Sequence, residues 1–123
     1  MLKTLLFTFA AVGMLLFAGC RKAEITPSAA AKLWMQALID GDHATANEYS
    51  TTEVHFLNAK ALENFRENPQ AKTKLQQEIN KIDSYKVVIE GDTAKLFAPG
   101  EETTPLLLKK VNGKWRVAYK ESL

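Results

Sequence analysis

The chain has 123 residues, of which 46% are hydrophobic and 24% are charged, with 16 basic and 14 acidic side chains. This composition is typical of a globular domain and excludes a disordered tail or a coiled coil. The near balance of charge argues against a nucleic-acid binder, which needs a clustered basic surface. A chain of this length encloses one hydrophobic core, so we expect a single domain.

The first nineteen residues have the three parts of a secretory signal peptide. Lys3 gives a positive start, the stretch 5–18 is apolar apart from Thr8 and Gly13, and small residues close it. The alternative is a permanent membrane-spanning helix. Seventeen uncharged residues lie between Lys3 and Arg21, which is the lower limit for crossing a bilayer.

Cys20 is the only cysteine in the sequence, and it follows Ala18 and Gly19 where the apolar stretch ends. This arrangement resembles the signal of bacterial lipoproteins, although Phe17 stands where that family usually has leucine. The resemblance implies that residues 1–19 are removed and that Cys20 is acylated as the first residue of the mature protein. A stable anchor needs at least two acyl chains, which lipoproteins of this kind carry.

Lipid on the cysteine leaves no thiol for a disulfide, so the domain must be stabilised by packing alone. We expect residues 20–26 to form a lipidated start and a short linker, and residues 27–123 to form the folded domain. The linker is short enough to keep the domain near the bilayer. The lipoprotein resemblance implies a cell-envelope protein facing the periplasm or the exterior, and Arg21 favours the outer membrane where two membranes are present.

Capping signals predict helices in the first half of the domain. Thr26 is a suitable N-cap before Pro27, and Gly41 suits the left-handed end of the helix that follows. Asp42 then caps a short helix over 43–49.

The next stretch, 53–67, fits a helix less well, because Phe56 points to the wrong face and Asn58 falls among apolar residues. A short extended piece over 54–57, with Asn58 capping a helix, fits better. Asn68 and Pro69 restart the pattern as cap and first residue of a further helix.

From residue 84 the hydrophobic period changes to two, which predicts two hairpins. The first joins 85–90 to 93–98 around Gly91-Asp92. The second joins 106–111 to 114–119 around Asn112-Gly113, a strong signal because a type I′ turn requires positive φ twice.

These turns set the register, and the register sorts the side chains into two faces. The inner face is almost wholly apolar and is expected to pack against the helices; it carries Tyr85, Val87, Ile89, Ala94, Leu96, Ala98, Leu106, Leu108, Lys110, Trp115, Val117 and Tyr119. The outer face carries Lys86, Lys95, Lys109, Lys114 and Arg116, mixed with Val88, Phe97, Leu107 and Ala118. We therefore predict the α+β class, with N-terminal helices packed on a C-terminal four-stranded antiparallel meander.

The Gly41-Asp42 helix junction and the Gly113-Lys114-Trp115 hairpin, with helices placed before a meander, resemble the small bacterial lipoproteins of nuclear-transport-factor-2-like (cystatin-like roll) fold. The resemblance implies a cone-shaped pocket between the helices and the sheet. That superfamily includes isomerases, dehydratases, binding proteins and secretion-system components, so the fold alone assigns no activity.

No catalytic constellation is expected. Proton transfer needs a titratable group beside the substrate, and the predicted inner face has no Asp, Glu or His. The helices offer Asp40, Asp42, His43, Glu53 and His55. Both aspartates are explained more simply as helix-terminal residues, and Glu53 and His55 are not spaced for one helix face. The two histidines lie twelve residues apart, match no metal-ligand spacing and imply no metal or cofactor.

Six aromatic residues are candidates for lining the pocket: Trp34, Tyr49, Phe65, Tyr85, Trp115 and Tyr119. The simpler interpretation is that they fill the core. The functional alternative is an apolar cavity in which tyrosine hydroxyls orient a small ligand.

The outer face is the preferred site, with Lys86, Lys95, Phe97, Lys109 and Arg116 as its binding residues. Lys109 and Arg116 are predicted to lie directly opposite each other, and unrelieved like charges across a strand pair are destabilising. This pattern favours an acidic protein partner, anionic lipid or a second copy of the chain. The alternative is a solvated lysine-rich face that discourages edge aggregation.

The favoured function is a non-enzymatic, lipid-anchored binding or assembly module; the alternative is a small-molecule binder or an enzyme using the pocket.

Overall fold

The structure, a computed structural model, describes residues 24–119, so the signal sequence and Cys20 lie outside the described residues. Four helices come first: α2 (Pro27–Asp40), α3 (His43–Glu48), α4 (Thr52–Glu67) and α5 (Pro69–Lys81). After a short 3₁₀ turn, η1 (Ile82–Ser84), come strands β1 (Lys86–Glu90), β2 (Thr93–Phe97), β3 (Leu106–Val111) and β4 (Lys114–Val117). The prediction of an α+β domain with helices before a meander is confirmed.

The helix boundaries follow local capping chemistry. The Thr26 hydroxyl accepts a hydrogen bond from the Ala29 amide (3.2 Å), and Gly41 ends α2 in the left-handed conformation with φ of 72°. The Asp42 carboxylate caps α3 by accepting from the Thr45 amide (3.1 Å). The predictions for these two helices are confirmed.

The expected extended piece over 54–57 is wrong, because α4 runs without a break through this stretch. Asn58 lies inside the helix, where its amide is fully buried and accepts a hydrogen bond from the Trp34 indole N–H (2.8 Å). Burying a polar side chain on the core face is favourable when its hydrogen bonds are made. The polar residue that interrupts the apolar pattern is therefore part of the core.

The sheet is an antiparallel meander in the order β1-β2-β3-β4. Both predicted hairpin registers are confirmed, with Glu90 opposite Thr93 and Lys109 opposite Arg116. At the second turn Asn112 and Gly113 have φ of 52° and 77°, as a type I′ turn requires.

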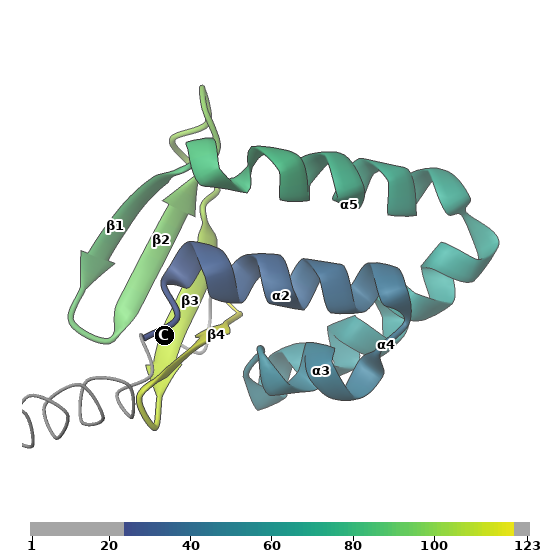
Figure 1. The fold of residues 1–123 in the computed structure, drawn as a ribbon, viewed down its shortest axis with the longest axis horizontal. Coiled ribbons are helices and arrows are strands. Elements are labelled where there is room, and N and C mark those ends of the chain that lie inside the picture. The colour runs from purple at the N-terminus through teal and green to yellow at the C-terminus, as the bar shows by residue number, and fades with distance from the viewer. Residues whose placement is uncertain (1–23, 120–123) are drawn as a thin grey trace, which may run out of the picture.

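The helical layer covers one face of the sheet, with α2 lying across it and α5 alongside α2 (Figure 1). The largest group of buried residues joins α2 and η1 to the inner face, where Ala94, Leu96, Leu108, Trp115 and Val117 are buried. The expectation that the whole inner face is covered is wrong for β1, because Val87 and Ile89 are 39% and 54% exposed. Strand β1 lies at the edge of the sheet beyond α2 (Figure 1).

The connection between α3 and α4 is tied to the last strand. Ser50 forms a parallel bridge with Val117, and the Thr51 amide donates to the Val117 carbonyl (2.8 Å) while the Val117 amide donates to the Tyr49 carbonyl (2.8 Å). This bridge fixes the first turn of α4 beside β4.

Candidate functional site

The candidate site is the outer face of the sheet, which we define by the outward side chains of β1–β4. Cross-strand pairing groups them into rows: Lys86 opposes Phe97, Lys95 lies between Val88 and Leu107, and Lys109 lies between Thr93 and Arg116. The side chains of Lys95, Phe97, Lys109 and Arg116 are partly buried, and Lys86 is exposed. The structure thus places all five predicted partner-binding residues on one face.

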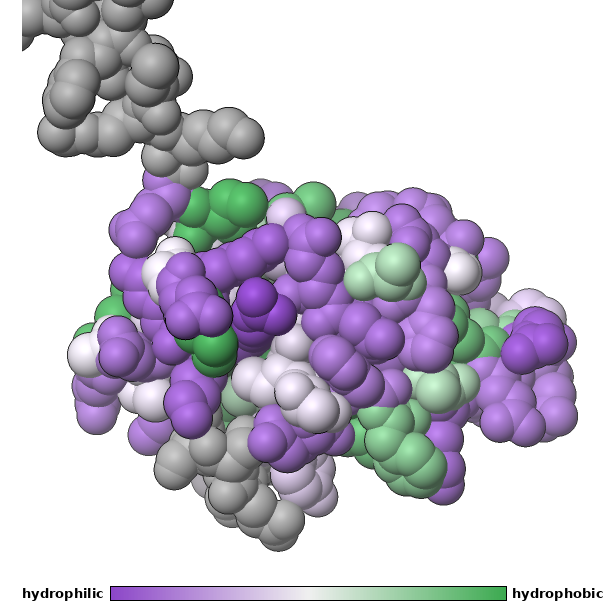
Figure 2. Space-filling model, turned by 90° about the horizontal axis from the view of Figure 1, so that it is seen from below, coloured by the Kyte–Doolittle hydropathy of each residue, from purple (hydrophilic) through white to green (hydrophobic). Residues whose placement is uncertain are grey.

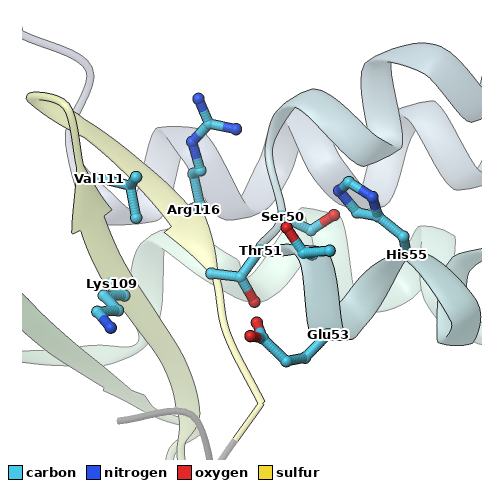
Figure 3. Close-up of a pocket in the computed structure, with 8 residues that line it drawn as sticks. Ser50, Thr51, Glu53, His55, Lys109, Val111 and Arg116 are labelled. Atoms are coloured by element: carbon cyan, nitrogen blue, oxygen red, sulfur yellow. The ribbon is translucent and has the colours of Figure 1, made fainter.

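A pocket of about 220 Å³ lies at the β4 end of this face. Figure 3 shows the start of α4 on one side of it and strands β3 and β4 on the other. The lining residues are Ser50, Thr51, Thr52, Glu53, His55, Lys109, Val111 and Arg116. The pocket therefore combines two sets of candidates from the sequence, the Lys109–Arg116 pair and the Glu53–His55 pair.

The like charges of Lys109 and Arg116 are relieved within the chain. Their side chains diverge, as Figure 3 shows. The polar environment of its own backbone amide and of the nearby Thr51 hydroxyl lowers the pKa of Glu53, and the charges of Lys109 and His55 lower it further. The Lys114 ammonium lowers the pKa of Glu48, with a smaller contribution from Arg116. The two like charges were expected to be unrelieved, but Glu53 of α4 lies near Lys109 and Glu48 of α3 lies near Arg116.

Lys114 is also held locally. Its ammonium lies 2.7 Å from the Glu48 carboxylate and 4.4 Å from the centre of the Tyr49 ring. Among the described residues, no ion pair involves Lys86 or Lys95. The β1–β2 half of the outer face also has carboxylates nearby, because Glu90 lies on the same face of β1, and Glu101 and Glu102 line a pocket of about 370 Å³ with Lys86 and Phe97.

The acid–base candidates from the helices are not arranged as a catalytic pair. His55 Nε2 lies 3.0 Å from the Asn47 carbonyl, so that nitrogen donates to α3 and does not face Glu53. Asp40 accepts a hydrogen bond from Gln36 (3.0 Å), Asp42 is the cap of α3, and His43 is exposed in the first turn of α3. Within residues 24–119 there is no cluster of three or more potential metal ligands.

The six aromatic candidates are spread over several environments. Trp34, Tyr49 and Tyr85 pack around the core group that contains buried Trp115, whereas Phe65 packs on a second group formed by Ala37, Leu38 and Ala46. Tyr119 is 44% exposed. Of the six, Tyr85 lines an open pocket of about 270 Å³ together with Met35, Leu96 and Leu106.

Tyr85 is bound to an acidic residue that is not part of the pocket lining. Its hydroxyl donates a hydrogen bond to the Glu78 carboxylate of α5. Burial, reinforced by the hydrogen bond and the negative charge of Glu78, raises the pKa of Tyr85 to about 12. A phenol with this pKa stays protonated at neutral pH and can only donate or accept hydrogen bonds as the neutral group.

The sequence analysis missed a buried polar network behind the first pocket. Asn58 donates to the Ser50 hydroxyl (2.9 Å) and to the Asn47 side chain (3.0 Å), and the Ser50 hydroxyl donates to the Ala46 carbonyl (2.7 Å). The signal was visible, since Asn58 interrupts an apolar helical face, but its partners lie on other elements.

The pocket of about 370 Å³ beside Lys86 and Phe97, also lined by Glu101 and Glu102, is a further hollow in the surface. Viewed from below, the surface is mostly hydrophilic with separate hydrophobic patches (Figure 2). In the part of the chain that the structure describes, no helix has the length and apolarity needed to cross a membrane. Comparison with protein-family models, with curated proteins and with solved structures finds no match to this chain.

Proposed function

We propose that the chain is a lipid-anchored protein of the bacterial cell envelope whose domain binds an acidic segment of a protein partner through the outer face of its sheet. The observation that carries the proposal is the placement of Lys86, Lys95, Phe97, Lys109 and Arg116 on the face opposite the helical layer. This arrangement gathers cationic and apolar side chains on one face, where Glu53 and Glu48 already lie near Lys109 and Arg116, and Lys86 is exposed.

The chemistry of the face favours a partner with both acidic and apolar groups. Lys95 is flanked by Val88 and Leu107 across the strands, and Phe97 lies next along β2. Positive charge beside apolar side chains attracts an acidic segment and gives it an apolar surface to bury.

The proposed anchor is supported by the sequence around Cys20. Cells labelled with a palmitate analogue should incorporate label into the wild-type chain, and Cys20→Ser should lose both the label and the membrane fractionation. Lys22→Ala is the matched control, because it changes a neighbouring residue and keeps the thiol. Equal labelling of the wild type and Cys20→Ser would contradict the anchor.

The binding surface is tested by a photo-crosslinking amino acid placed at Phe97 in living cells. We expect adducts with acidic peptides at Phe97 and none at Gln76, an exposed position on α5. Lys95→Glu should lower the adduct yield about tenfold, because it replaces an attraction by a repulsion. Lys74→Glu on exposed α5 changes the net charge equally and should have no effect. Equal yields for the two reversals would overturn the proposed surface.

We further propose that the domain belongs to the nuclear-transport-factor-2-like lipoproteins, and that it acts without catalysis. The order of helices before a meander, with the Gly41-Asp42 junction and the Gly113-Lys114-Trp115 hairpin, supports the family assignment. The orientations of Glu53 and His55 toward different partners support a binding role.

The second candidate function is small-molecule binding at the Tyr85 pocket. It is favoured by the pairing of Tyr85 with Glu78 beside apolar Met35 and Leu96. A ligand bound there should raise the melting temperature of the wild-type protein in a metabolite panel and raise that of Tyr85→Phe less. A panel without any shift would contradict this function.

A further inference from the structure

Strand β1 has one free side. Its only neighbour in the described sheet is β2, so it forms an edge. The two-residue turn makes Glu90 and Thr93 a hydrogen-bonded pair, and alternation along the strand then directs the backbone groups of Val87 and Ile89 away from β2. An unpaired row of this kind is a template for another strand.

Strand β1 has a charged residue at each end, Lys86 and Glu90, but it lacks other usual protections of an edge strand. Strand β1 contains no proline, and it pairs with β2 in unbroken register from Lys86 to Glu90, without a bulge. Val87 and Ile89 are substantially exposed on the inner face, where the helical layer does not reach them. The edge thus combines free backbone groups with uncovered apolar side chains.

We propose that a second copy of the chain pairs with this edge, β1 against β1, antiparallel and centred on Val88. The sequence of the strand is self-complementary in this register: Lys86 opposes Glu90 of the other copy, Val87 opposes Ile89, and Val88 opposes itself. Lys86 and Glu90 have no ion-pair partner among the described residues, so they are available for the two new pairs. Both charges lie on the outer face, whereas the four apolar side chains form one strip on the inner face.

The two charge pairs favour this register over its neighbours. The two nearest registers that keep the faces aligned place Lys86 opposite Val88, or Val88 opposite Glu90, and lose both charge pairs. In the centred register Val87 and Ile89 form hydrogen-bonded pairs, while Val88 faces its counterpart in a non-hydrogen-bonded pair. The result is a continuous eight-stranded sheet, with the helical layers of both copies on the same side. Lys86 is shared with the proposed partner site, and the two proposals are distinguished by their probes, because Val88 reports on the dimer and Phe97 reports on the partner site.

The test is a disulfide across the two-fold axis in the full chain. Opposed residues of a non-hydrogen-bonded pair have Cα atoms about 4.5 Å apart, which suits a disulfide. Val88→Cys should therefore give linked pairs of peptides spanning residue 88 when oxidised glutathione is added. Lys95→Cys is the matched control on the same face, since the β2 strands of the two copies lie about 14 Å apart. Analysis of the linked peptides separates this product from any dimer formed through Cys20.

Charge exchange tests the register. In the Val88→Cys background, Lys86→Glu alone or Glu90→Lys alone creates like-charge pairs and should reduce the linked fraction about tenfold. The double exchange restores opposite charges and should restore linkage. Linkage that is absent in Val88→Cys, equal in Lys95→Cys, formed to a different protein, or not restored by the double exchange would overturn the proposal. Photo-crosslinking at Phe97 reports separately on the partner site, so the two proposals can fail independently.

Discussion

Asn58 organises the polar part of the core. Its side chain accepts a hydrogen bond from the Trp34 indole N–H and donates hydrogen bonds to Ser50 and Asn47. One amide therefore connects α4 with α2, with α3 and with the segment that follows α3. Hydrogen bonds made in a buried environment are costly to lose, because the groups left behind have no water to replace the partner.

We predict that Asn58→Ala destabilises the protein by about 2–3 kcal/mol, because it removes a fully buried amide and leaves the partly buried Trp34 indole N–H without its acceptor. Urea denaturation followed by circular dichroism measures the change in the free energy of unfolding. Asn64→Ala is the matched control, since Asn64 is exposed on the same helix. An equal effect of both substitutions would contradict the role of the network.

The raised pKa of Tyr85 predicts that the free energy of unfolding falls at alkaline pH. Its pKa is raised from 10.0 to about 12 in the folded protein, mainly by burial and then by Glu78. Between these values the unfolded chain loses the phenol proton and the folded protein keeps it, so the contribution of Tyr85 is complete below pH 10 and is lost as the pH rises to about 12. Urea unfolding across this window should show a shallower decline for Tyr85→Phe. Parallel pH profiles of the wild type and the variant would contradict the shift.

At the scale of the elements, the sequence predicted those helix and hairpin boundaries that capping and turn residues determine locally. Thr26-Pro27 and Gly41 bound α2, and Asn112-Gly113 set the last hairpin, because each acts through its own backbone conformation. The start of α4, over 54–57, was missed because the polar side chain of Asn58 finds its hydrogen-bond donor on α2 and an acceptor on α3. The exposure of β1 was missed because hydrophobic alternation indicates a face and does not indicate how far a helical layer extends.

The Asn112-Gly113 turn allows the cost of a positive φ angle to be measured without a steric contribution. A Cβ added at Gly113 meets no atom within 4 Å, so the cost of Gly113→Ala comes from its φ of 77° alone. We predict a loss of about 1–2 kcal/mol for Gly113→Ala in urea denaturation, and a smaller loss for Gly113→Asn, which tolerates this conformation better. A Gly113→Ala variant as stable as the wild type would show that the turn does not constrain the sheet.

At the scale of the molecule, the two core groups are physically joined. Trp34 and Leu75 each pack against both the sheet-side group and the smaller group of Ala37, Leu38 and Ala46. Shared side chains couple the stabilities of the regions that they connect.

We therefore predict a single cooperative unfolding transition. Tryptophan fluorescence, which reports on Trp34 and Trp115, and far-ultraviolet circular dichroism, which reports mainly on the helices, should have coincident midpoints in urea. Leu75→Ala should lower both midpoints together. Separate midpoints in the wild type would mean that the helical and sheet parts unfold independently.

The sequence predicted which face of the sheet carries the candidate site, but it did not predict which acidic residues lie beside the basic ones. The two hairpin turns were enough to place Lys109 opposite Arg116. The carboxylates of Glu48 and Glu53 that balance them come from α3 and α4, more than forty positions earlier, and only the folded chain brings them to the sheet. The same distance in sequence hid the shared pocket of Glu53, His55 and Arg116.

The bridge between Ser50 and Val117 has a consequence for biosynthesis. A ribosome makes the four helices long before it reaches β4, yet Trp115 and Val117 supply core surface on which those helices pack. The nascent helices lack that surface until β4 has been made, so closure of the domain is a late event that depends on slow, distant pairing.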